Sequence, residues 1–464
     1  MSRRTDLTAP SDPALAPGEA RCPGRSMQDI LDADGDNPPS AMRTEQYEFL
    51  GNADLPFDRY HDPAFLQREL DQLWPNVWQW ACREEHIPDP GDRYVYDVDH
   101  HSVLVVRGAD GAIRAFINSC PHRGMKFAAE GSHGVRRNQI RCPFHGMSWH
   151  LDGSLREIPC RWDFPHVEDE SFGLDQIACE LWGGFVFIHM GEDPPPLAEQ
   201  LEVLPEHFRL WPMHDRYVAL HTEKVLPANW KMAMEAFLEA FHVLETHSQA
   251  VFTAADANAQ YDIFGRHVSR FIHAVGVPSP HLKQEVGEAA LFGKLGRDPA
   301  QLPPGASARA EHARLLRQEL GAQFGVDLSQ VSTSEMMDSI EYFLFPNAFF
   351  FPGIGIRLCY RFRPLGVDQS LHEILVLQPL PANGERPPPA TPIRLEVADS
   401  YTSVPGFALA EILDQDTDNL ALQRDGARAS RKGAQTLGNY QEARIRRLHL
   451  TLDEYLARPP AAQA

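Results

Sequence analysis

The chain has 464 residues, of which 43% are hydrophobic and 23% charged, an ordinary globular composition with room for two or three domains. Its 64 acidic and 43 basic residues give a formal charge of −21, which argues against nucleic acid and anionic membrane surfaces as partners. No apolar run approaches the roughly 20 residues of a membrane span, and the faint twin-arginine pattern at Arg3-Arg4 is followed by no apolar segment. We therefore expect a cytoplasmic protein.

The first third of the chain is predicted to contain an irregular arm, one helix and several short strands. Residues 1–44 are rich in Pro, Asp, Ala and Gly without periodicity, so we expect a largely irregular N-terminal arm. A helix is predicted after the Asp62-Pro63 pair, because three leucines follow at helical spacing. Residues 45–195 are expected to form a small all-β domain with this helix before it. Its strands are predicted at residues 93–98, 102–107 and 113–118.

Two matched loops lie in this region. They read C-P-H-R-G from Cys120 and C-P-F-H-G from Cys142, so each supplies one thiolate and one imidazole. Two Cys and two His can bind one zinc ion, or they can bind a Rieske [2Fe-2S] cluster with both thiolates on one iron and both imidazoles on the other. Zinc sites usually pair Cys with Cys and His with His, so one of each per loop favours the cluster. The candidate ligands are Cys120, His122, Cys142 and His145.

A second candidate metal site lies at residues 229–247, N-W-K-M-A-M-E-A-F-L-E-A-F-H-V-L-E-T-H. This run is apolar and helix-favouring, and it contains Glu239, His242 and His247. Two imidazoles and one carboxylate on one face of an ion are typical of a non-haem Fe(II) site that activates oxygen. On a straight helix His247 would point roughly 140° away from His242, so we predict that the helix ends or bulges between them. The alternative is an amphipathic helix with a satisfied histidine at each end.

The second half of the chain is predicted to hold a larger domain. A hairpin is expected at residues 179–188, and Pro194-Pro195-Pro196 marks the boundary before residues 196–464. An insert at residues 278–334, loop-like apart from an amphipathic helix at 306–324, is interpreted either as a lid or as peripheral packing. Strands are expected at 269–274, 341–351, 354–364 and 373–379, and a final helix at 405–456 should be split by Gly426 and Gly433.

The two loops, C-P-H-R-G and C-P-F-H-G-M-S-W, followed by N-W-K…E-A-F-L-E-A-F-H-x4-H, resemble the motifs of the Rieske non-haem iron oxygenases. These are the catalytic alpha subunits of aromatic ring-hydroxylating dioxygenases and related monooxygenases. The resemblance runs from about residue 45 to about residue 445. It implies an α+β fold, in which a small all-β Rieske domain precedes a helix-grip-like catalytic domain with an antiparallel sheet and long helices.

The resemblance also implies two iron cofactors, a [2Fe-2S] Rieske cluster and a mononuclear Fe(II). His242 and His247 would bind the mononuclear iron, while the four loop residues would hold the cluster. The carboxylate ligand should lie in the acidic segment L-D-Q-D-T-D-N-L, which matches the family best with Asp416 as the ligand. Asp414 and Asp418 are the alternatives.

Glu239 takes the position of a carboxylate that, in the family, links two subunits. It would hydrogen-bond the iron-ligating His242 and, across a subunit boundary, the cluster histidine His145 of a neighbour, orienting both rings. The resemblance therefore implies a ring-shaped homotrimer, with or without a small beta subunit. A plain surface glutamate is the alternative interpretation of Glu239.

Three positions depart from the family pattern. The bridging carboxylate is more often Asp than Glu, and Ala236 and Phe241 stand where the family often has Asn and Tyr. Loss of two polar groups near the metal predicts a drier pocket and a large apolar substrate. The expected function is hydroxylation of a hydrophobic, aromatic or polycyclic compound with O2. The alternatives are a monooxygenase or an O- or N-demethylase of the same family, and a Rieske electron-transfer protein without oxygenase activity.

Electrons are expected to come from a separate protein. The chain has no G-x-G-x-x-G nucleotide fingerprint and no plant-type ferredoxin cysteine pattern. They would derive ultimately from NAD(P)H through a ferredoxin or a reductase. Basic residues around the cluster loops are predicted to guide an acidic partner, unless they are only solvated loop charges. They are Arg123, Lys126, Arg136, Arg137 and Arg141.

Overall fold

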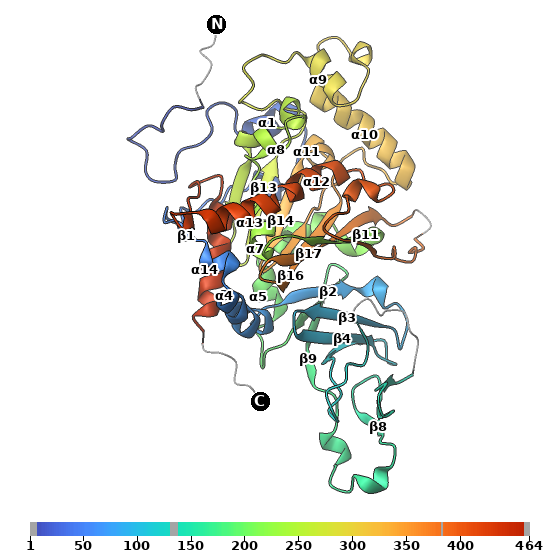
Figure 1. The fold of residues 1–464 in the computed structure, drawn as a ribbon. Coiled ribbons are helices and arrows are strands. Elements are labelled where there is room, and N and C mark those ends of the chain that lie inside the picture. The colour runs from blue at the N-terminus through green and yellow to red at the C-terminus, as the bar shows by residue number, and fades with distance from the viewer. Residues whose placement is uncertain (1–6, 130–137, 382–383, 459–464) are drawn as a thin grey trace. The chain divides into compact units, whose positions relative to one another are not determined.

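The computed structural model of the protein describes residues 7–129, 138–381 and 384–458 (Figure 1). The chain divides into two compact units. The small unit is built mainly from Leu66–Gln200, and the large unit from Leu201–Arg363, Val367–Asp453 and the segment that ends at Phe65. Residues 45–65, which the sequence analysis grouped with the small domain, therefore belong to the large unit.

The small unit is organised around a six-stranded antiparallel sheet. Its strand order is β2-β10-β9-β5-β4-β3, and the predicted strands and hairpin form its main part. The strands of this sheet are β2 (Gln79–Arg83), β3 (Arg93–Val98), β4 (His101–Arg107), β5 (Ile113–Ile117), β9 (Gln176–Trp182) and β10 (Phe185–His189). A three-stranded sheet carries the second cluster loop and contains β6 (Ile140–Arg141), β7 (Ser148–Trp149) and β8 (Leu155–Glu157).

The large unit contains an eight-stranded sheet with the order β12-β13-β14-β15-β16-β17-β11-β18. Strands β12 to β16 pair antiparallel, whereas β18 joins β11 in parallel. The α+β fold class is therefore as predicted. The strands are β11 (Arg216–Leu226), β12 (Gln260–Ile263), β13 (Val268–His273), β14 (Ser339–Leu344), β15 (Ala348–Phe350), β16 (Leu358–Gly366), β17 (Gln369–Pro379) and β18 (Ile393–Leu395).

Two details of this sheet differ from the predictions. The strand expected at residues 341–351 is two strands, because a turn at residues 345–347 contains Pro346, which has no N–H to donate to a ladder. Strands β11, β12 and β18 were not predicted. Buried polar residues such as Lys224 and Asp262 interrupt the apolar pattern of β11 and β12, and β18 has only three residues.

Short helices connect the strands, and longer ones carry the insert and the C-terminal region. The N-terminal helices are α1 (Met27–Asp34), α2 (Ser40–Arg43), α3 (Asp58–His61) and α4 (Pro63–Arg68). The others are α5 (Leu197–Leu201), α6 (Leu204–His207), α7 (Trp230–Glu235), α8 (Val243–Thr246), α9 (Glu288–Lys294), α10 (Ala308–Phe324), α11 (Thr333–Met337), α12 (Ala410–Asp418), α13 (Leu420–Ala429) and α14 (Ala443–Leu456). A short ladder joins β1 (Leu55–Pro56) to β19 (Ala434–Gln435). None of the helices in the described ranges is long and apolar enough to cross a membrane.

The C-terminal region is broken differently from the prediction. Gly426 lies inside α13 and does not split it. The breaks fall at Asn419 and across residues 430–442, where Gly433 has a φ of +69° that favours glycine. Figure 1 shows α12 and α13 as consecutive red helices, and α13 contacts α7.

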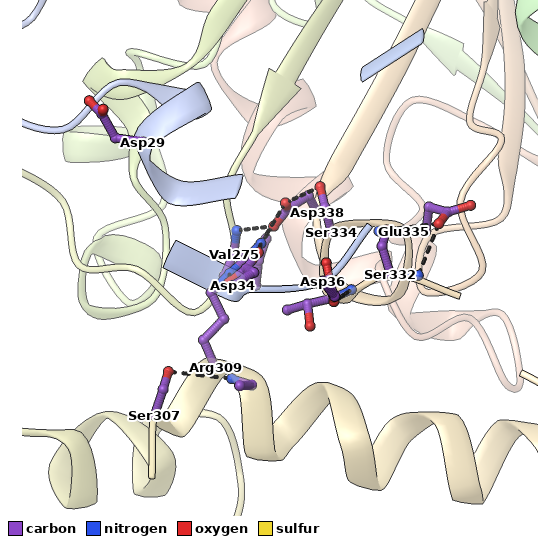
Figure 2. A network of polar contacts seen from close by, with 12 residues as sticks. Asp29, Asp34, Asp36, Val275, Ser307, Arg309, Ser332, Ser334, Glu335 and Asp338 are labelled. Carbon is purple, nitrogen blue, oxygen red and sulfur yellow. Dashed lines mark hydrogen bonds and ion pairs between the residues drawn. The ribbon is translucent and has the colours of Figure 1, made fainter. Parts of the chain in front are cut away.

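The N-terminal arm is more ordered than its composition suggested. Helix α1 begins with a capping box between Ser26 and Asp29, and Gly35 ends it in a left-handed conformation. The arm then reaches the insert, whose predicted helix is α10. Asp34 pairs with Arg309 of α10, which also pairs with Asp338, the residue between α11 and β14 (Figure 2). The insert further contains α9, so it is not otherwise loop-like as predicted.

Candidate active site and cluster-binding loops

The two Cys-His loops of the small unit have the same backbone design. In the first loop, the Cys120 N–H donates to the Met125 carbonyl at 2.9 Å, and the Gly124 N–H donates to the Cys120 carbonyl at 2.8 Å. The second loop repeats both bonds between Cys142 and Met147 and between Gly146 and Cys142. Both glycines have φ above +70°, a conformation that side chains disfavour. These closed turns hold one cysteine and one histidine each in matching positions.

The four predicted cluster ligands separate into a thiol pair and an imidazole pair. Cys120 and Cys142 are buried beside Trp149, and burial raises the pKa of Cys120, with a further contribution from the adjacent Cys142 thiol. The rings of His122 and His145 meet at the surface with their centroids 4.7 Å apart. A Rieske cluster needs this separation of thiolates from imidazoles.

A single zinc ion fits the loops less well. Tetrahedral zinc holds its donors at about 2.0–2.3 Å, so all four atoms must converge on one point. Within the described ranges, the four side chains do not form a group whose donor atoms lie within 4.8 Å of one another. The loops are therefore suited to a two-iron cluster.

In the large unit, the predicted run at residues 229–247 folds into two short helices. Helix α7 begins with Asn229, whose side chain accepts from the Lys231 N–H, and ends at Glu235. Residues 236–241 are not helical. His242 and His247 stand immediately before and after α8, and His247 has left the helical conformation, with a φ of −118° and a ψ of 53°. The predicted helix end between the two histidines is confirmed.

Asp416 of α12 joins the two histidines. His242 Nε2 lies 3.3 Å from His247 Nε2 and 3.3 Å from Asp416 Oδ1, while His247 Nε2 lies 2.8 Å from the same oxygen. Ligands at right angles around an ion, each at about 2.1 Å, lie about 3.0 Å apart. These three atoms thus have the spacing of three adjacent ligands on one face of a metal ion.

Neighbouring side chains hold the Nδ1 atoms of both histidines. His242 Nδ1 donates to Glu239 Oε1 at 2.6 Å, and the other oxygen of Glu239 accepts from the Phe241 and His242 backbone N–H groups. His247 Nδ1 donates to Gln415 Oε1 at 2.8 Å. With a proton on each Nδ1, both Nε2 atoms direct lone pairs at Asp416 Oδ1, and among the described residues this buried oxygen has no hydrogen bond of ordinary geometry. Three acceptors facing one point require a cation.

The electrostatics of the site agree with this geometry. Burial lowers the pKa of His242, but Asp416 and Glu239 outweigh it and raise that pKa to about 10. Positive charge is therefore favoured between these side chains, whether as a proton or as a metal ion.

The two alternative carboxylates have other roles. Asp414 Oδ1 accepts from the Tyr401 N–H at 2.9 Å and lies 3.3 Å from Lys224 Nζ, whereas Asp418 is exposed. Neither belongs to the group formed by the two histidines and Asp416. Gln415 was not singled out in the sequence, where its only signal was its position between two aspartates.

A pocket of about 200 Å³ opens beside His242 and Asp416. Ala236 borders it, but so do several carboxylates, and Phe241 is 44% exposed. The drier pocket predicted from Ala236 and Phe241 is therefore not found on this side of the site. The acidic residues that line the pocket are Glu235, Glu239, Asp416 and Glu442.

Comparison with known families identifies both units. Residues 77–168 match the Rieske [2Fe-2S] domain, and residues 211–458 match the catalytic domain of the ring hydroxylating alpha subunit. The chain belongs to this family of oxidoreductases, the catalytic subunits of Rieske oxygenases with a cluster domain and a mononuclear iron domain. Oxygenase components of this family use O2 on small-molecule substrates and take electrons from a separate reductase or ferredoxin.

Individual relatives are more distant. The oxygenase subunit of glycine betaine monooxygenase from Chromohalobacter salexigens is 26% identical over 72% of this chain and 74% of its own length. The large oxygenase component of salicylate 5-hydroxylase from Ralstonia is 29% identical over 41% of this chain and 48% of its own length. A quaternary ammonium Rieske monooxygenase in complex with L-carnitine shares the fold, with a TM-score of 0.62, 16% identity, and coverage of 89% of this chain and 99% of that one.

Proposed function

We propose that the chain is the oxygenase component of a monooxygenase that hydroxylates a carbon atom attached to the nitrogen of a quaternary ammonium compound. The support is the glycine betaine monooxygenase subunit, which matches along most of both chains. One oxygen atom enters the C–H bond, and the other leaves as water with two electrons and two protons. The hydroxylated product splits into a carbonyl compound and a tertiary amine, which agrees with the demethylase alternative.

Aromatic hydroxylation, which we predicted from the sequence, is a second candidate. The salicylate hydroxylase component favours it, although that match covers less than half of either chain.

We assign His242, His247 and Asp416 as the ligands of the mononuclear iron. The observation that carries the proposal is the convergence of their three donor atoms, within 3.3 Å of one another, on a single point. The cluster ligands proposed are Cys120, His122, Cys142 and His145. When bound, the iron supplies oxygen activation and the cluster supplies an electron. The protein supplies ring orientation through Glu239 and Gln415.

A single-turnover screen tests the substrate class. The protein is purified without air, its cluster is reduced, and return of the oxidised absorption band is followed after O2 is added. We expect quaternary ammonium compounds to accelerate this return and to yield a tertiary amine and a carbonyl compound. The Asp416→Ala variant is the control, and its cluster should not respond to substrate. Acceleration only by salicylate or arenes would replace the first candidate by the second.

We further propose that Glu239 links His242 to the cluster histidine His145 of a neighbouring copy in a homotrimer, so that the electron passes from that cluster to the iron through this hydrogen-bonded contact. Glu239 is buried, but with the partly exposed His242 it borders a pocket that opens to solvent, and His145 is exposed on its own unit. This pocket and His145 are therefore accessible to a second chain. Mixed trimers test this: a His145→Ala chain and an Asp416→Ala chain, each inactive alone, are co-expressed with different affinity tags, and trimers that contain both chains are purified and should be active. Mixed trimers that contain cluster and mononuclear iron but remain inactive would refute transfer between subunits.

We also propose that basic side chains at the cluster loops guide an acidic electron donor. Arg123 and Arg141 are exposed, whereas Lys126 pairs with Asp97 at 3.0 Å. The predicted Arg136 and Arg137 lie outside the described residues. Changing Arg123 and Arg141 together to Gln should slow cluster reduction and weaken its dependence on ionic strength. A wild-type reduction rate insensitive to salt would contradict this proposal.

A further inference from the structure

The two histidines of the site are oriented by different chemical groups. Glu239 lies three residues before His242 in the same segment and accepts from His242 Nδ1 with a carboxylate. Gln415 reaches His247 from a distant part of the chain and accepts with a neutral amide oxygen. The side chain of Gln415 is itself positioned, because Gln249 Nε2 donates to the same oxygen at 2.7 Å. Two donors on one oxygen fix the amide with its oxygen toward His247.

Helix α12 therefore holds both ring nitrogens of His247. Gln415 Oε1 lies 2.8 Å from Nδ1, and Asp416 Oδ1 lies 2.8 Å from Nε2. Consecutive residues of a helix point about 100° apart, so Gln415 and Asp416 can approach an imidazole from its two sides. The ring cannot rotate about its own axis without losing one of these contacts.

We propose that Gln415 is a positioning residue for the iron site, which fixes the tautomer and the ring plane of His247. The inference rests on the proposed function, in which His247 binds iron through Nε2. An acceptor at Nδ1 is required because a proton on Nε2 would block that atom. The amide also adds no charge next to the ligands: the imidazoles are neutral, and the carboxylates that contact them, Asp416 and Glu239, carry two negative charges, which balance one divalent ion. A carboxylate at position 415 would add a third.

The charge and the acceptor can be separated by substitution. Gln415→Met keeps the length of the side chain but removes the acceptor, while Gln415→Glu keeps an acceptor and adds a charge. Asp418→Asn is the matched control, because Asp418 is exposed on the same helix. Each iron-depleted protein is titrated anaerobically with Fe(II) against a chelator, and the nitric oxide complex of the bound Fe(II) is examined by electron paramagnetic resonance. Absorption of the Rieske cluster reports folding.

We expect Gln415→Met to lower Fe(II) affinity about 10- to 100-fold and to change the paramagnetic resonance spectrum of the nitric oxide complex. Gln415→Glu should keep Fe(II) affinity close to that of the wild type but shift this spectrum. Asp418→Asn should match the wild type. Wild-type affinity and spectrum in Gln415→Met would overturn the inference alone, whereas absence of Fe(II) binding in the wild-type chain would overturn the proposed function as well. If Gln415→Met fails to fold, an unshifted spectrum in Gln415→Glu would overturn the inference.

Discussion

Replacing Arg309 by Met should destabilise the large unit by about 4 kcal/mol. The Arg309 side chain is buried and donates to Asp34 at 2.7 and 2.9 Å and to Asp338 at 2.6 and 2.8 Å, besides the Val275 carbonyl (Figure 2). Removing one partner of a buried ion pair costs roughly 3–5 kcal/mol, because the remaining charge is left uncompensated. Two carboxylates lose their partner here, which raises the cost. Asp338 keeps hydrogen bonds from the Val275 N–H and the Ser334 hydroxyl, and these bonds limit the loss of stability.

Arg314 provides the matched control, because it lies on the same helix, pairs with Glu311 at 2.7 Å and is largely exposed. Arg314→Met should cost less than about 1 kcal/mol. The free energy of unfolding is measured by urea denaturation, and hydrogen exchange of α10 and α11 shows whether the loss is local. Asp34→Asn should fall between the two variants, since Arg309 keeps Asp338. Equal destabilisation by Arg309→Met and Arg314→Met would refute the view that the arm and the insert are joined by this network.

Three further changes test the two metal sites and the pocket. Asp416→Ala should remove the mononuclear iron but keep the cluster absorption, as measured by iron content and visible spectroscopy, whereas Asp418→Asn should keep both. Cys142→Ser should abolish the cluster absorption while Fe(II) binding in the large unit persists; a retained band would exclude Cys142 as a ligand. Burial and the nearby Glu239 and Glu235 raise the pKa of Glu442 to about 7. The folded pKa is above the unfolded value of about 4.3, so stability is present at low pH and lost as pH rises through 7. Glu442→Gln should therefore raise the Tm at pH 8 by the equivalent of about 3 kcal/mol, with little change at pH 4; an equal effect at both pH values would contradict this account.

The predictions that succeeded depend on local sequence. The strands at residues 93–117 are short runs rich in Val, Ile, Tyr and Phe, and the Cys-His loops carry their candidate ligands within a few residues, so short windows were sufficient. The end of the helix before His247 followed from geometry alone, because two ligands five residues apart cannot face one ion on a straight helix.

The predictions that failed depend on long-range contacts. Strand β11 lies between β17 and β18 in its sheet, yet its buried Lys224 pairs with Asp414, which lies 190 residues away. The amphipathic helix predicted at residues 306–324 contains Arg309, which the structure buries, with Asp34 and Asp338 compensating its charge. A short stretch of sequence does not show that a charged residue is buried when the residue that neutralises it lies far away in the chain. The prediction for Gly426 failed for a different reason: glycine can break a helix, but at this position the chain remains helical and Gly426 lies inside α13.

The acidic segment of α12 shows how the structure separates residues that look alike in the sequence. Asp414, one residue before Gln415, attaches the helix to the rest of the unit through the Tyr401 N–H and Lys224. Gln415 then orients His247, and Asp416 presents its oxygen to both histidines. An anchor, a positioning group and a candidate ligand thus occupy three consecutive residues. Because one helix carries all three, the position of α12 sets both the placement of Asp416 and the orientation of His247, whereas Glu239 orients His242 from its own segment.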